Sequence, residues 1–171
     1  MWRKHHKDWY MLTFKELYSI YVHDVYRFAF WLSGSSVEAE DITAETFVRA
    51  WMNFSSIRTE TLKGYLLKIA RNVYLAQIKK RRKQTELQDT HHDPLPGPEK
   101  AAEISSELEE IRTFLQTLPE IDRAAFIMRI QYELPYAEIA RVLRISEVAA
   151  KVKVHRVRKK LIANRIGKEK A

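Results

Sequence analysis

The sequence predicts an all-α protein made of two small helical domains joined by a flexible linker. Apolar residues recur at intervals of three and four along most of the 171-residue chain, and no segment shows the two-residue alternation of a β-strand. Only four Gly and five Pro are present, which favours long uninterrupted helices over a turn-rich β fold. Three of those Pro and one Gly fall within positions 94–98, where neither a helix nor a central strand can continue.

The first domain is expected to contain three helices. Capping boxes of the form T-x-x-E at 13–16 and S-x-x-E at 35–38 mark the starts of two helices, and Gly34 is expected to end the first. A third helix is predicted over about 62–82, after the stretch "SSIRTET" breaks the pattern. The apolar positions at helical spacing are Leu17, Ile20, Tyr21, Val25, Phe28, Leu32, Val37, Ile42, Phe47, Trp51, Tyr65, Leu66, Ile69, Val73 and Ile78.

The second domain is expected to contain four helices, of which the last two have helix-turn-helix spacing. One amphipathic helix ends near Pro119, and another covers 121–131. Helix 136–143, a three-residue turn and helix 147–161 then form the helix-turn-helix, with Ser146 as a suitable N-cap. The apolar positions expected to face inward are Ile104, Leu108, Ile111, Leu115, Phe126, Ile127, Ile130, Ala150, Val154, Val157 and Leu161.

Four segments follow from these patterns. Residues 1–11 form an N-terminal extension, 12–84 the first domain, 85–100 the linker and 101–167 the second domain.

Charge is distributed unevenly along the chain, whose net charge is +8. Residues 79–83, "KKRRK", are five consecutive cations. Residues 84–122 hold ten acidic and two basic residues, and residues 151–171 hold nine basic and one acidic residue. Two basic segments on either side of an acidic centre favour a nucleic-acid partner over an ordinary solvated surface.

Several classes of protein are disfavoured by the composition. The chain has no Cys, no apolar run long enough to span a membrane and no signal peptide, so a cytoplasmic protein without membrane insertion is expected. No Ser/His/Asp, HExxH or paired-carboxylate constellation is present, which argues against an enzyme such as a small nuclease. No catalytic residue, cofactor or metal site is predicted, including at the pairs His5-His6 and His91-His92.

The outward face of helix 147–161 predicts contact with DNA. In a helix-turn-helix the N-terminal part of the second helix enters the major groove. Lys151, Val152 and His155 lie early on this face and are expected to meet base edges, since an exposed Val can pack against a thymine methyl. The cations expected to contact phosphate are Lys153, Arg156, Arg158 and Lys159. The alternative is a basic surface helix of a bundle.

These residues carry a resemblance to a known family. "LPYAEIARVLRISEVAAKVKVHRVRKKL" resembles region 4.2 of the extracytoplasmic-function (ECF, group IV) sigma factors of bacterial RNA polymerase, and "LPEIDRAAFIMR" resembles region 4.1. "AEDITAETFVRAW" resembles region 2.2, and "GYLLKIARNVYLAQIKKRRK" resembles regions 2.3 and 2.4. The resemblance covers about residues 12–165 in the family's order and spacing. It implies a non-enzymatic factor that binds core polymerase and reads the −10 and −35 promoter elements.

The resemblance also assigns roles by position. The face that docks on the β′ clamp helices is matched by Asp41, Glu45 and Trp51. Trp51 equally fits a core position. Asp41 and Glu45 show no paired cation in the sequence. The second domain is expected on the β flap. Residues 55–63 match the −10 loop, for which the candidate DNA contacts are Arg58, Lys63, Tyr65, Arg71, Asn72, Lys79 and Arg82. Tyr65 is the better candidate for a core residue, and Arg71 and Asn72 equally fit structural roles.

The sequence departs from the family pattern at a few positions. Ala44 replaces a common Gln, Ala76 a usual Asp and Ala149 a Thr that contacts phosphate. Arg144 stands in place of a frequent Gly, which argues against a left-handed turn there. These changes bear on the promoter sequence recognised more than on the fold.

The resemblance implies regulation by an anti-sigma factor that covers the polymerase- and DNA-binding faces. The competing interpretation is a stand-alone helix-turn-helix regulator with a ligand-sensing N-terminal domain. Residues 12–83 show acidic and cationic faces rather than a polar-lined pocket, which favours the sigma factor.

Overall fold

The computed structural model describes residues 13–54, 61–87 and 105–169, which contain seven α-helices and no β-strand. The predicted fold class is confirmed. The helices are α1 (Phe14–Ser33), α2 (Ser36–Met52), α3 (Leu62–Leu87), α4 (Ser106–Gln116), α5 (Glu120–Ile130), α6 (Tyr136–Leu143) and α7 (Glu147–Glu169). The predicted N-terminal extension, Arg58, most of the predicted linker and Ile104 lie outside the described residues.

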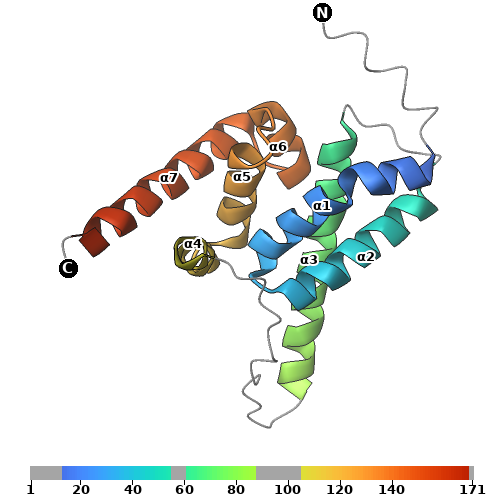
Figure 1. Cartoon of the computed structure of the whole chain (residues 1–171), viewed down its shortest axis with the longest axis horizontal. Helices are drawn as coiled ribbons and strands as arrows, with labels where there is room; N and C mark the ends of the chain where they lie inside the picture. The colour runs from blue at the N-terminus through green and yellow to red at the C-terminus, as the bar shows by residue number, and fades with distance from the viewer. Residues whose placement is uncertain (1–12, 55–60, 88–104, 170–171) are drawn as a thin grey trace, which may run out of the picture.

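Helices α1, α2 and α3 form the first bundle, with the capping predicted from sequence (Figure 1). The Thr13 side chain accepts a hydrogen bond from the Glu16 backbone N–H, and the Glu16 carboxylate accepts one from the Thr13 backbone N–H. Gly34 ends α1 in the left-handed conformation, with φ 76°. Ser35 caps α2, but Glu38 does not complete that box and instead pairs with Arg81 of α3 at 2.6 Å. The caps therefore fix where α1 and α2 begin.

Helices α5, α6 and α7 form the core of the second bundle, and α6 and α7 are the predicted helix-turn-helix. Ser146 caps α7 by accepting a hydrogen bond from the Ala149 backbone N–H at 3.0 Å. The predicted inward positions Ala150, Val154 and Val157 are each 0% exposed. The orientation of α7 about its own axis is therefore as predicted.

The turn of this motif corrects one expectation. Arg144 has φ 56° and ψ 47°, so the left-handed turn forms without a glycine. Backbone hydrogen bonds close the end of α6 around it, from Ile145 N–H to Ala140 C=O at 3.0 Å and from Arg144 N–H to Arg141 C=O at 3.4 Å. These bonds, together with the partial burial of Ile145 against the core, hold Arg144 in a conformation that is unfavourable for a residue with a Cβ.

The two bundles pack against each other. α1 contacts α4 and α5, and α3 contacts α6, so the buried apolar residues form one continuous cluster across both halves. The Tyr132 hydroxyl donates to the backbone carbonyl of Asp24 at 2.7 Å, and burial raises the pKa of Tyr132, which keeps this donor protonated. In Figure 1, α1 lies next to the second bundle while α7 extends away from the first.

Two kinds of sequence expectation differ from the structure. α3 continues to Leu87, past the predicted boundary at 84, and α7 continues to Glu169 rather than ending at 161. Long polar helices carry no apolar periodicity at their ends, so their limits are poorly marked. Five apolar positions expected on inward faces are exposed: Ile20, Val37, Trp51, Leu108 and Ile130.

Candidate nucleic-acid and polymerase interfaces

The outward face of α7 combines apolar and basic side chains. Val152 is 48% exposed on the side opposite the buried stripe, and His155 is exposed beside it. Val148, one turn earlier, is 70% exposed and was not singled out from the sequence, although its i, i+4 relation to Val152 could have indicated it. Arg158 and Lys159 follow on the exposed side. This face is open along its whole length.

Lys151 lies at one edge of this face. Its ammonium is 3.1 Å from the Glu147 carboxylate and 5.8 Å from the centre of the Tyr136 ring. Arg129 lies over the same ring at 4.8 Å. Lys151 nonetheless remains more than half exposed, so this surface ion pair can be exchanged for another anion at little cost.

Two of the predicted phosphate contacts are paired within the second domain. Asp122 of α5 is 2% exposed, and its carboxylate accepts from Lys153 Nζ at 2.7 Å and from Arg156 Nη1 at 3.4 Å. The Lys153 side chain is 20% exposed, whereas that of Arg156 is 52% exposed. Arg156 is therefore still accessible to a ligand, and Lys153 is turned towards α5.

A second exposed face runs along α2. Asp41 and Glu45 lie on it one turn apart, and Val48 and Met52 continue the row at the next turns, 49% and 74% exposed. These two apolar residues were not predicted from the sequence, although the i, i+4, i+7, i+11 spacing from Asp41 indicates them. The row joins carboxylates to an exposed apolar surface, a composition suited to a protein partner.

On α2 the structure decides one open alternative and corrects one expectation. Trp51 is 61% exposed and touches Phe14 edge-on, with ring centres 4.8 Å apart, so it is not a core residue. Glu45 does have a paired cation, because Arg49 lies one turn further along and its Nε is 2.7 Å from the carboxylate. The pair is nearly half exposed on both sides and leaves the row accessible.

The first turns of α3 carry four residues expected at the −10 element. Lys63 Nζ is 3.0 Å from the Asp24 carboxylate and 5.6 Å from the centre of the Tyr132 ring. Arg71 makes two hydrogen bonds to Glu120 of α5, at 2.6 and 2.8 Å. Tyr65 packs partly against the core, and burial raises its pKa, while Asn72 is exposed. Both cations thus face the second bundle in this arrangement.

Glu138 of α6 lies against the start of α3. Its carboxylate accepts a hydrogen bond from the Thr61 hydroxyl, and a Cβ added to Gly64 would collide with it. Glu138 is 6% exposed. Carboxylates of the second domain therefore lie against the N-terminal part of α3 at two points, Glu138 and Glu120.

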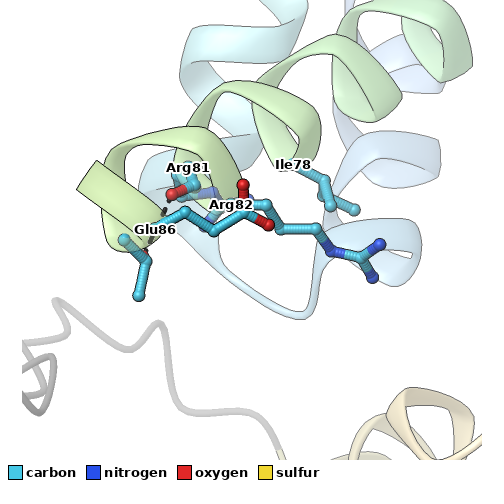
Figure 2. A pocket seen from close by; sticks show the side chains of 5 residues that line it. Ile78, Arg81, Arg82 and Glu86 are labelled. Carbon is cyan, nitrogen blue, oxygen red and sulfur yellow. Dashed lines mark hydrogen bonds between the residues drawn. The ribbon is translucent and has the colours of Figure 1, made fainter. Parts of the chain in front are cut away.

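The basic end of α3 is open. Lys79 and Arg82 are exposed, and no carboxylate of the described residues pairs with either. Figure 2 shows a shallow pocket here, lined by Ile78, Arg81, Arg82, Thr85 and Glu86, in which the Thr85 hydroxyl donates to the Arg81 carbonyl. The hydrogen bond from Arg81 to Glu38 raises the pKa of Arg81 and fixes it to α2. Lys79 and Arg82, like their exposed neighbours Lys80 and Lys83, are therefore accessible to an anionic ligand.

Two kinds of site are not found in the part of the chain that the structure describes. No group of three His, Cys, Asp or Glu side chains there could hold a metal ion. No described helix is long and apolar enough to cross a membrane.

Comparison with known proteins decides the family. The family models described as "Sigma-70 region 2" and "Sigma-70, region 4" match residues 17–84 and 108–161. The chain is 31% identical over 137 residues to the ECF RNA polymerase sigma factor EcfG of Rhodopseudomonas palustris, covering 80% of this chain and 76% of that one. The chain belongs to the ECF sigma factors of the sigma-70 family. It is accordingly a transcription initiation factor and not an enzyme.

Other relatives of this ECF sigma factor agree. It is 29% identical over 157 residues to SigM of Bacillus subtilis, covering 89% of this chain and 94% of that one. The sigma factor RpoE of Bartonella quintana, solved in complex with the anti-sigma factor NepR, matches with a TM-score of 0.76 at 26% identity, covering 86% of this chain and 93% of that one. The structure of CnrH with the cytosolic domain of CnrY shares the fold, with a TM-score of 0.67 at 19% identity, covering 90% and 88%.

Proposed function

We propose that this ECF sigma factor binds core RNA polymerase through α2, reads the −10 element with α3 and the segment before it, and reads the −35 element with α7. The observation that carries the proposal is the outward face of α7. Val152 and His155 are exposed on the side opposite a fully buried stripe, followed by Arg158 and Lys159. Exposed apolar and basic side chains on the second helix of a helix-turn-helix suit base edges and phosphates.

Within α7, Lys151, Val152 and His155 are assigned to base edges, and Arg156, Arg158 and Lys159 to phosphate. The first three lie within about two and a half turns of the N-terminus, which is the part of such a helix that enters the major groove. The others lie further along, where the helix leaves the groove floor.

At the −10 element, Lys63, Arg71 and Asn72 are assigned to the separated DNA strand, together with Arg58 of the preceding segment and with Lys79 and Arg82. Tyr65 is assigned to support of the bundle, in keeping with its partial burial. Because Arg71 is paired with Glu120 of α5, its contact with phosphate requires the two domains to move apart, whereas Lys63 is paired with Asp24 inside the first bundle.

Polymerase binding is assigned to the row Asp41, Glu45, Val48 and Met52, with Trp51 at its edge. The exposed Trp and Met supply apolar area, and the carboxylates supply orientation against the basic positions of the β′ clamp helices. The second domain is assigned to the β flap, in keeping with its family model.

We further propose that an anti-sigma factor holds this protein inactive. The support is the similarity to RpoE, which was solved with the anti-sigma factor NepR. An occupant that stabilises the packed domains would keep Arg71 paired with Glu120 and out of contact with DNA.

The decisive test is transcription from a promoter library by bacterial core polymerase with and without the purified protein. Initiation from a defined subset of −35 and −10 sequences is expected. Tight binding to a duplex operator by the protein alone, without association with core polymerase, would instead support a stand-alone regulator.

The assignment within α7 is tested by Lys151→Ala and Lys159→Ala on a library of −35 sequences. Lys151→Ala is expected to relax preference at one position by roughly 1–3 kcal/mol. Lys159→Ala is expected to weaken all sequences alike and to lower the salt slope by about one. The opposite pattern would show that α7 presents a different face to DNA.

A further inference from the structure

The buried carboxylate of Asp122 is the feature that promoter contacts do not account for. Asp122 lies in the first turn of α5, and its side chain is 3% exposed. Both of its cationic partners, Lys153 and Arg156, belong to α7. A carboxylate buried to this degree is costly unless it is paired, so the site constrains the position of its two partners.

The fully buried part of α7 is aliphatic, and the other ion pair that α7 makes with another helix, among the described residues, joins Arg165 to Glu107 of α4 near its C-terminal end. The inward residues of α7 are Ala150, Val154 and Val157, all small and aliphatic. Such a stripe fixes which side of the helix is buried, but it resists a small rotation or a sliding movement weakly, because contacts between aliphatic groups are not directional. The Lys153–Asp122 bond is directional, and Arg156 adds a second point of attachment one turn along.

The residues held by Asp122 flank those that face DNA. Lys153 directly follows Val152, and Arg156 directly follows His155. A rotation of α7 that lengthened the Lys153–Asp122 bond would therefore turn Val152 and His155 together. The carboxylate thus controls the direction of the two side chains assigned to base edges.

We propose that Asp122 is a positioning residue for −35 recognition, which fixes the rotation of α7 through Lys153 and Arg156. Lys153 then serves as an internal anchor rather than as a phosphate contact, whereas Arg156, half exposed, can bind Asp122 and DNA. The inference rests on the proposed function of α7 and adds to it a specificity determinant that does not touch DNA.

The experiment uses full-length protein assembled with core polymerase, a promoter library randomised in the −35 element, and thermal unfolding of the free chain. The variants are Asp122→Asn, Lys153→Met and the double variant, with Lys159→Met as the matched control for an exposed cation of α7. Base preference, the salt slope of duplex binding and the unfolding midpoint are measured for each.

Asp122→Asn is expected to lower the midpoint and to reduce base preference by about fivefold or more at the positions read by Val152 and His155. Lys153→Met is expected to leave the salt slope unchanged, whereas Lys159→Met lowers it by about one. The double variant leaves neither Asp122 nor Lys153 charged, so it is expected to recover most of the midpoint without recovering the base preference. If the double variant is stable but lacks the base preference, Asp122 acts by positioning α7 and not merely by stabilising the fold.

Three results would overturn the proposal: unchanged preference in Asp122→Asn, recovery of preference together with stability in the double variant, or a slope lowered by about one in Lys153→Met. If the wild-type protein selects no −35 sequence, the proposed function itself is refuted, and the role of Asp122 with it.

Discussion

Replacing Arg144 by Gly is expected to stabilise the protein. Arg144 joins α6 to α7 with φ 56° and ψ 47°, a conformation that costs a residue with a Cβ about 1–2 kcal/mol. Its side chain is exposed, so the substitution removes little packing. Glycine gives back about 0.5–1 kcal/mol because the unfolded chain gains conformational freedom. The net stabilisation expected is therefore about 0.5–1 kcal/mol.

For a chain of this length, about 1 kcal/mol shifts the unfolding midpoint by roughly 2–4 °C. Arg144→Gly is thus expected to raise the midpoint by about 1–4 °C in a thermal unfolding experiment followed by circular dichroism. The matched control is Ala76→Gly, an exposed substitution within α3 where the backbone is helical, which is expected to cost about 1 kcal/mol. A midpoint that falls equally in both variants would contradict a strained left-handed turn at Arg144.

Three further predictions concern the interfaces. Charge reversal of Asp41 and Glu45 to Lys should weaken core-polymerase binding at least tenfold in a pull-down titration, with unchanged helical content. The control variant Glu86→Lys, at the end of α3, should have little effect. If the two variants bind core polymerase equally well, Asp41 and Glu45 are not part of the polymerase-binding site. Glu120→Gln should loosen the packing of the domains, because it removes the charge and one of the two acceptor oxygens of a partly buried bidentate pair with Arg71. It should therefore increase the distance between fluorophores placed on α2 and α7. Gly64→Ala should have the same effect, since the added methyl collides with a carboxylate of α6; an unchanged distance in both variants would show that these contacts do not hold the domains together.

Much of the fold could be predicted because local chemistry is decisive in helices. The capping box at Thr13, the left-handed end at Gly34 and the cap at Ser146 all form as predicted. The buried stripe of α7 was predictable because i, i+4, i+7 spacing defines one side of a helix without knowledge of its neighbours. α6 begins and ends where the sequence indicates, at Tyr136 and Leu143.

The remaining errors depend on tertiary context. Periodicity does not distinguish the buried side of a helix from an apolar side reserved for a partner, which is why Trp51 and Val37 were grouped with core positions although both are exposed. The absence of a glycine argued against the left-handed turn at Arg144, because that criterion does not consider the backbone hydrogen bonds that hold the turn. The partners of Lys63 and Arg71 could not be predicted either. Lys63 pairs with Asp24 of α1, which nothing in the sequence marks as a partner, and Arg71 pairs with a residue 49 positions away.

The shared core of the two domains has a consequence for how the protein acts once it meets polymerase. The contacts between α1 and α5 and between α3 and α6 contribute free energy only while the halves are together, so a ligand that separates them opposes the whole of that energy. Whichever ligand separates the domains first, polymerase or DNA, leaves less packing free energy for the second ligand to oppose. Each ligand therefore raises the affinity for the other by the same factor. The domains should therefore engage a promoter cooperatively, with an apparent affinity for either element alone that is lower than the intrinsic affinity of the separated domain.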